Sequence, residues 1–167
     1  MPQTLGAFLA MMVVMLFTIN FQRASIQTQR KMLSSEVDVM ANAVASEAMQ
    51  YVAAKSFDAV IASGTMNPSN ANVSMLTELS AFGGGIAYAD ALDIDDFDGV
   101  SHTVTYETGW GSDLTFVLDF DVHYVDEASG LESPTPTWTK EVTIEVSGQD
   151  IMISPIRLKR QFSPLWY

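Results

Sequence analysis

The 167-residue chain contains no cysteine, and this absence excludes disulfide bonds, thiolate metal sites and cysteine nucleophiles. Basic residues are also scarce, because 8 Lys and Arg stand against 20 Asp and Glu, for a net charge of −12 at pH 7. Between residues 32 and 156, only Lys55 and Lys140 accompany all 20 acids. Because a surface this acidic repels phosphate backbones, we expect no nucleic-acid partner. The acidic surface either serves solubility or meets a basic cluster on a neighbouring copy.

Charged side chains are missing altogether from residues 1–22. At ~1.5 Å per residue, a helix of this length spans about 30 Å, the thickness of the hydrocarbon core of a bilayer. We do not expect a cleaved signal peptide, because no Lys or Arg precedes Leu5 and no change of pattern follows Phe21.

The charges that follow this segment leave two alternatives for it. In the first, the segment is a simple membrane anchor, and Arg23, Arg30 and Lys31 lie on the cytoplasmic side. In the second, a short basic leader preceded Met1 and has been removed, so that the leader determined the orientation.

Proline is absent between Pro2 and Pro68, so nothing breaks a helix that starts in the apolar segment. From Leu33 onward, apolar residues recur every three or four positions, which predicts one amphipathic helix face. These residues are Leu33, Val37, Met40, Val44, Ala48 and Tyr51 or Val52. We therefore predict one helix from about Pro2 to Phe57, roughly 80 Å long, with local loosening over residues 20–28.

The rest of the chain has the pattern of an antiparallel sheet. A glycine run at residues 83–85 is expected to be a bend, because no phosphate-loop Lys-Ser/Thr follows it. Alternation of apolar and polar residues predicts strands over 102–108, 113–125, 140–147 and 151–162, the last interrupted by Pro155. The longest strand should turn one apolar face toward the helix residues Val37, Met40, Val44 and Tyr51. That face comprises Leu114, Phe116, Leu118, Phe120, Val122 and Tyr124.

The predicted fold class is therefore α+β, with a long N-terminal helix packed on a small antiparallel β-sheet. We expect a protruding apolar helix over residues 1–30. The globular domain should cover residues 31–167 and include the second half of the helix.

Carboxylates are densest in the stretch DIDDFDG at residues 93–99. Asp93, Asp95, Asp96 and Asp98 form a candidate Ca²⁺ site, because four carboxylates within six residues suit a hard cation. The alternative is an exposed turn whose Asp side chains bind its own backbone. Asp119, Asp121 and His123 on one strand face make a weaker zinc candidate. No framed catalytic motif is present in the sequence, so we expect neither an enzyme nor any other cofactor.

The order of an uncharged half-helix, an amphipathic half-helix, a loop and a small antiparallel sheet resembles that of type IV pilins and pseudopilins. The DIDDF stretch at residues 93–97 also resembles a turn that often precedes the sheet in pilin-like proteins. The resemblance implies a subunit that waits in the inner membrane and then joins copies of itself in an extracellular helical homopolymer. The implied assembly surface on the helix comprises Leu5, Phe8, Leu9, Met12, Val13, Leu16 and Phe17.

The chain departs from this family at several positions. Met1 and Leu5 stand where the family usually has Phe and a register-setting Glu, and Gln22 stands where a helix-loosening Pro is common. The disulfide of many major pilins is impossible without cysteine. Arg23, Arg30 and Lys31 are the substitute candidates for contacts that set the register between subunits.

A structural filament subunit is the function that the sequence favours, with a minor pseudopilin of a secretion system as the nearest alternative. A monomeric membrane-anchored surface domain and a viral structural protein with an apolar arm also remain open, and an enzyme is the least favoured class. The sequence does not distinguish adhesion, motility, DNA uptake and secretion as roles of a filament.

Overall fold

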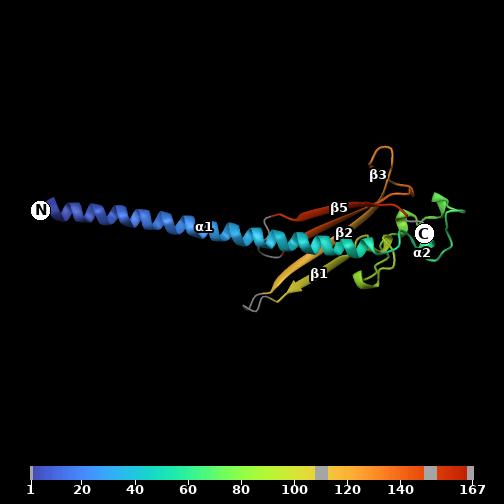
Figure 1. Cartoon of the computed structure of the whole chain (residues 1–167), viewed down its shortest axis with the longest axis horizontal. Helices are drawn as coiled ribbons and strands as arrows, with labels where there is room; N and C mark the ends of the chain where they lie inside the picture. Colours follow the sequence, from blue (N-terminus) through green and yellow to red (C-terminus); the bar gives the residue numbers. More distant parts are fainter. Residues whose placement is uncertain (1, 108–112, 149–153, 165–167) are drawn as a thin grey trace. The chain divides into compact units, whose positions relative to one another are not determined.

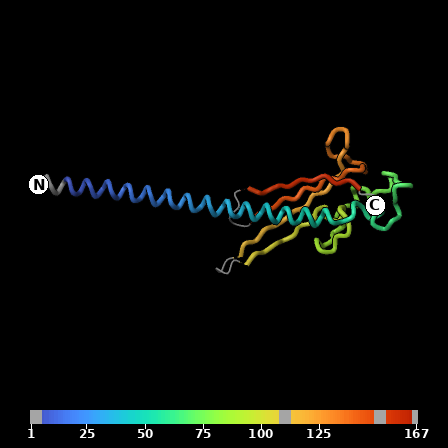
Figure 2. The backbone as a smooth tube through the Cα atoms, viewed as in Figure 1, coloured from blue at the N-terminus to red at the C-terminus, as the bar shows by residue number. Residues whose placement is uncertain are grey.

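The computed structural model describes residues 2–107, 113–148 and 154–164, and for residues 2–5 it describes the backbone alone (Figures 1 and 2). The chain divides into two compact units, residues 1–39 and residues 40–167. One helix, α1, runs through the first unit and ends in the second. The fold is α+β, as the sequence predicts.

Helix α1 spans Pro2–Ala53, a run of 52 residues and about 78 Å. It is helical throughout residues 20–28, so the predicted loosening there is wrong. The helix also ends before Phe57, because Ser56 leaves it to form a β-bridge with Asp93, in which the Ile94 N–H donates to the Ser56 carbonyl at 3.0 Å. The apolar Phe57 side chain is buried from the connection between α1 and α2 rather than from the helix.

The last turns of α1 provide the helical layer of the globular unit, where they cover one face of the sheet. Their buried residues follow the period of one helix face. They are Ala41, Val44, Ala45, Ala48, Met49 and Val52. Of the residues predicted for this face, Val37 is also buried, Tyr51 is half-buried, and Met40 and Leu33 are 37 % and 52 % exposed.

Short elements connect α1 to the sheet. Helix α2, Ala59–Ala62, begins at Asp58, whose carboxylate accepts from the Val60 N–H at 3.1 Å. Four 3₁₀ turns follow: η1 Val73–Met75, η2 Leu79–Ala81, η3 Tyr88–Asp90 and η4 Asp95–Phe97. The glycine run precedes η3, and all three of its glycines have positive φ.

The sheet has five strands, all antiparallel to their neighbours. They are β1 Ser101–Tyr106, β2 Leu114–Val125, β3 Glu132–Ser133, β4 Lys140–Gly148 and β5 Ile156–Phe162. The order is β1-β2-β4-β5, and β3 pairs with the end of β2. Strand β5 begins directly after Pro155, which lacks the N–H that a ladder requires. The predicted start of this strand at residues 151–153 lies outside the described residues.

The inner face of the sheet agrees with the alternation in the sequence. Phe116, Leu118, Phe120, Val122 and Tyr124 on β2 are all buried, and Leu114 at the strand end is half-buried. From β4, the buried apolar residues are Val142, Ile144 and Val146. Because β2 and β4 are the central strands, this face and the last turns of α1 form the core of the globular unit.

The outer face of the sheet is polar and carries cross-strand ion pairs. Arg157 Nε lies 2.6 Å from Glu145 Oε2, and Lys159 Nζ lies 2.8 Å from Glu141 Oε1. His123 Nε2 is 3.6 Å from the same Glu141 oxygen. Two of the three bases near the C-terminus are therefore already paired within the chain.

Because Phe116 and Phe120 are buried on the inner face of the sheet, we expect large losses of stability in Phe116→Ala and Phe120→Ala. Each change should lower the free energy of unfolding by about 3–5 kcal/mol, because it leaves a cavity at a fully buried site. Thermal or denaturant unfolding of the detergent-solubilised chain measures the loss. Leu131→Ala is the control, since Leu131 is 68 % exposed and should tolerate truncation. Unfolding unchanged in both Phe variants would show that the face assignment is wrong.

Candidate functional site

The first candidate site is the apolar surface of α1 over residues 6–21, which we call the apolar helix segment. Its side chains are exposed on every face of the helix, including Phe8 at 76 %, Val13 at 44 % and Phe17 at 73 %. The remaining described residues of the predicted assembly surface are also exposed: Leu9, Met12 and Leu16. The side chain of Leu5 lies outside the described residues. A surface this apolar is not stable in contact with water and must be covered by lipid or by protein.

The Thr18 hydroxyl and the helical backbone of the apolar helix segment are paired within the helix. The Thr18 hydroxyl donates to the Val14 carbonyl at 2.9 Å, and the backbone N–H and C=O groups are paired along α1. By length and composition, α1 is able to cross a membrane. A helix is one of the two structures that can do so, because it leaves no backbone group without a partner in hydrocarbon.

The three bases next to this segment are available to a partner. Arg23, Arg30 and Lys31 are exposed, and none forms an ion pair with any residue in the described ranges 2–107, 113–148 and 154–164. By contrast, Arg157 and Lys159 pair with glutamates of their own sheet. Of the two basic clusters in the sequence, the one on α1 is therefore the better candidate for contacts between subunits.

The carboxylates of the 93–98 loop are occupied by the protein itself, in part as the self-bonded turn predicts. Asp93 Oδ1 accepts from the N–H groups of Asp95 and Asp96, Asp96 Oδ2 accepts from Leu92, and Asp98 Oδ1 accepts from Val122. No group of three or more His, Asp or Glu side chains suited to a metal ion occurs in the described parts of the chain. The geometry thus gives no support to the predicted Ca²⁺ site of Asp93, Asp95, Asp96 and Asp98.

The loop is not the exposed turn that the sequence suggests, because it closes over a second candidate site, a buried ion cluster around Lys140. The Lys140 side chain is fully buried, and Asp58, Asp93 and Asp95 are at most 5 % exposed. Lys140 Nζ lies 3.0 Å from Asp58 Oδ2, touches Asp95 Oδ1, and donates to the Phe57 carbonyl at 2.7 Å.

Aromatic rings surround this ammonium group. Its nitrogen is 4.3 Å from the centre of the Phe57 ring, 5.2 Å from that of Tyr124 and 5.3 Å from that of Phe82. The rings stabilise the cation through their π faces and exclude water from it. The Tyr124 hydroxyl donates away from the cluster, to the Thr77 carbonyl at 2.7 Å.

The two carboxylates that contact Lys140 differ in their electrostatics. Burial alone would raise the pKa of Asp58, but the Lys140 ammonium and the N–H groups of Thr77 and Val60 outweigh it and hold this pKa below its usual value. Burial raises the pKa of Asp95 to about 7, and Asp58 and Asp93 add to the rise while Lys140 opposes it. Within the described residues, Asp95 Oδ2 accepts no hydrogen bond. Asp58 is therefore held as a carboxylate, whereas Asp95 takes up a proton readily.

A glycine permits the close approach of the backbone at the rim of this cluster. Gly83 has φ +76°, and its N–H donates to the Asp95 carbonyl at 2.9 Å. A Cβ at this position would lie 2.2 Å from the carbonyl oxygen of Asp98, so no other residue is accommodated without a backbone shift. The glycine run is thus a structural turn that holds the 93–98 loop in place.

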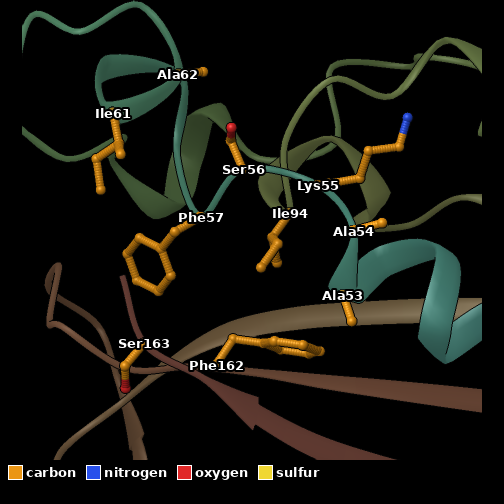
Figure 3. Close-up of a pocket in the computed structure, with 10 residues that line it drawn as sticks. All are labelled: Ala53, Ala54, Lys55, Ser56, Phe57, Ile61, Ala62, Ile94, Phe162 and Ser163. Carbon is orange, nitrogen blue, oxygen red and sulfur yellow. The ribbon is translucent and has the colours of Figure 1, made fainter. Parts of the chain in front are cut away.

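A cleft of about 500 Å³ opens nearby, between the end of α1, helix α2 and the end of β5 (Figure 3). Phe57, Ile94 and Phe162 lie around its open space, whereas the Lys55 side chain extends away from it and donates to the Ala91 carbonyl at 2.6 Å. Among the described residues, the lining includes no carboxylate and no imidazole. The cleft is therefore a poor candidate for a catalytic site.

Lys140 is the residue of this region that sequence reasoning overlooked. The sequence contained an indication of this burial, because Lys140 lies on the same alternating face of β4 as the inward-facing Val142, Ile144 and Val146. Lys55 and Lys140 are also the only bases in the acidic body of the chain. A lone base in phase with a buried strand face indicates a buried ion pair, and its two contacting acids come from the 93–98 loop and from Asp58.

No family model, no curated protein and no solved structure matches this chain.

Because of the buried ion cluster, we expect Lys140→Met to lower the free energy of unfolding strongly and Lys159→Met to lower it only slightly. Removal of Lys140 leaves Asp58, Asp93 and Asp95 buried without their cation and should cost about 3–5 kcal/mol in the free energy of unfolding. Lys159 is 59 % exposed, and loss of its pair with Glu141 should cost less than about 1 kcal/mol. Chemical denaturation of the two variants measures the difference. Equal stabilities would show that the buried cluster does not hold the fold together.

Proposed function

We propose that the protein is a structural subunit of an extracellular helical filament, assembled through the apolar helix segments of many copies. The observation that carries this proposal is the exposure of apolar side chains on every face of α1 over residues 6–21. Burial of such a surface against identical helices removes it from water at a gain of about 25 cal/mol per Å². The resemblance of the sequence to type IV pilins supports the same function.

The composition of the segment suits helix–helix packing as well as lipid. Gly6, Ala7 and Ala10 are small, and a Cβ at Gly6 would meet nothing within 4 Å. Small residues on a helix surface let neighbouring backbones approach closely in an apolar environment. The same segment therefore serves first as a membrane anchor and then as part of the filament core.

Exposed apolar residues beyond the membrane-length stretch favour assembly over a lone anchor. Ile26 and Leu33 are seven residues apart, as are Met32 and Val39, and all four are at least 51 % exposed. A seven-residue apolar repeat is the pattern of helices that pack along one another. An anchor that only holds a domain at a membrane needs about 20 apolar residues and no such continuation.

In this proposal the subunit resides in the inner membrane before assembly and on the cell surface afterwards. A minor pseudopilin of a secretion system would use the same surface in a shorter assembly. A monomeric surface domain would keep α1 in lipid permanently, and the experiments below separate that case from the other two.

A charge inside the bundle should abolish assembly. In Leu9→Asp and Val13→Asp, a carboxylate would be buried in the filament core without a partner, so we expect no filaments while the sheet domain stays folded. The matched control is Gln27→Asp, which adds the same charge at an exposed polar position of α1. Electron microscopy and sedimentation of sheared surface material report assembly, and thermal unfolding reports the fold. Normal filaments from either core variant would refute the packing scheme.

Charge contacts between subunits should depend on the bases of α1. We expect replacement of Arg23, Arg30 and Lys31 by Gln to weaken assembly, most clearly at low ionic strength, where screening is least. Replacement of Arg157 and Lys159 by Gln is the comparison, because those bases are already paired within their own sheet. Pelleted fractions over a salt series give the readout. Parent-like assembly of the α1 variant at low salt would contradict this role.

A further inference from the structure

We propose that the buried ion cluster is the site of an intramolecular amide cross-link, formed between Lys140 Nζ and the side-chain carboxyl carbon of Asp95 with Asp58 as the proton-transfer group. The inference goes beyond the proposed filament and does not depend on it. It rests on the placement of an amine, an acyl group and a base in one water-excluded space.

The reacting groups are already in contact. Lys140 Nζ touches Asp95 Oδ1, and both side chains are held in place by the fold, one on β4 and the other on η4. Groups fixed at contact distance react with effective molarities of about 10⁵–10⁸ M, because the entropy of bringing them together has been paid on folding. Aromatic rings at 4.3, 5.2 and 5.3 Å from the nitrogen keep competing water away from both groups.

Asp95 is the better acyl group of the two carboxyls beside the amine. Asp58 uses both oxygens to accept backbone N–H groups, from Val60 at 3.1 Å and from Thr77 at 3.0 Å. Within the described residues, Asp95 Oδ2 has no hydrogen-bond partner, so this oxygen is free to leave. A carboxyl whose pKa is raised to about 7 is protonated often enough at neutral pH for its oxygen to depart as water.

Asp58 is placed to move the protons. Its Oδ2 lies 3.0 Å from Lys140 Nζ, and its hydrogen bonds and the ammonium keep it ionised before reaction. It accepts a proton from the ammonium, which frees the nitrogen lone pair for attack on the Asp95 carboxyl carbon. It then passes protons from the nitrogen to the departing oxygen.

The reaction balances without a co-reactant. The bond between Nζ and the carboxyl carbon forms, and one carbon–oxygen bond of Asp95 breaks. Of the three ammonium protons, two leave with the Asp95 oxygen as water and one stays on the amide nitrogen. The charges of the ammonium and the carboxylate cancel, and no oxidant or reductant is consumed. The product joins β4 covalently to the 93–98 loop.

Mass spectrometry of the full chain, purified in detergent, tests the inference. The intact protein should be lighter than its sequence by the mass of one water molecule, and Lys140→Met should have its full sequence mass. Lys159→Met, the control with an exposed lysine, should still lack one water. Wild-type protein at its full sequence mass would overturn the proposal.

Peptide mapping separates the cross-link from other losses of water, such as a succinimide at Asp98-Gly99. A lysine-specific protease cuts uncross-linked protein after Lys31, Lys55, Lys140 and Lys159, but in cross-linked protein Lys140 is blocked and residues 56–159 remain one fragment. Further cleavage at aromatic residues should give a branched peptide with the amide on Asp95. Normal cleavage at Lys140, or an amide on another carboxyl, would refute the assignment.

The role of Asp58 has its own test, in Asp58→Asn. The amide oxygen can still accept a backbone N–H, but the group no longer accepts a proton from Lys140. We expect loss of water in the folded variant to be slower by about 10²-fold or more, followed by intact mass against time. Thermal unfolding verifies that the variant is folded. Cross-linking at the parent rate would overturn the role of Asp58.

Discussion

Folding of the globular unit depends on the burial of a single cation. Lys140 lies at the start of β4, yet it binds Phe57 and Asp58 from the segment after α1 and Asp95 from the 93–98 loop. Three parts of the chain that are distant in sequence thus meet at one nitrogen. Buried acids are tolerated only with such a partner, because each would otherwise lose its hydration without compensation. Three features lie at or beside this site: the Gly83 turn, the Asp58 cap of α2 and the aromatic rings around Lys140.

The start of helix α1 has the opposite difficulty, since residues 6–22 have no charge and, within the described residues, no cover. Its last turns form part of a core, whereas residues 6–21 expose apolar side chains on all sides. One continuous helix therefore needs two environments. In the proposed function, lipid covers the apolar part of the helix before assembly, and identical helices cover it afterwards. The exposed apolar pairs Ile26 with Leu33 and Met32 with Val39, each seven residues apart, lie beyond a membrane-length stretch and support the proposed helix packing.

Local periodicity was enough to predict α1, the central strands and the inner face of β2, because each of these depends on alternation within one element. It failed where a distant residue decides the outcome. The amphipathic pattern predicted a helix to about Phe57, but the helix ends at Ala53 because Ser56 pairs with Asp93. The 93–98 loop looked like an exposed turn or a cation site, because its counter-charge comes from Lys140. The position of Lys140 on the inward-facing side of β4 indicated its burial, but only the pairing of the strands shows which acids Lys140 contacts.

In the proposed filament, the apolar helix segments of neighbouring copies cover one another. Because the chain has no cysteine, Leu16→Cys provides a unique site for a nitroxide label within the segment. Packed helices lie about 8–10 Å apart, so labels in assembled material should show strong dipolar broadening that disappears on dilution with unlabelled subunits. A label at Ser129, exposed in the globular unit, gives the reference. If the labels at position 16 were instead magnetically isolated, and oxygen dissolved in lipid increased their relaxation, the segment would lie in lipid alone. That result would contradict packing between the helices of neighbouring copies.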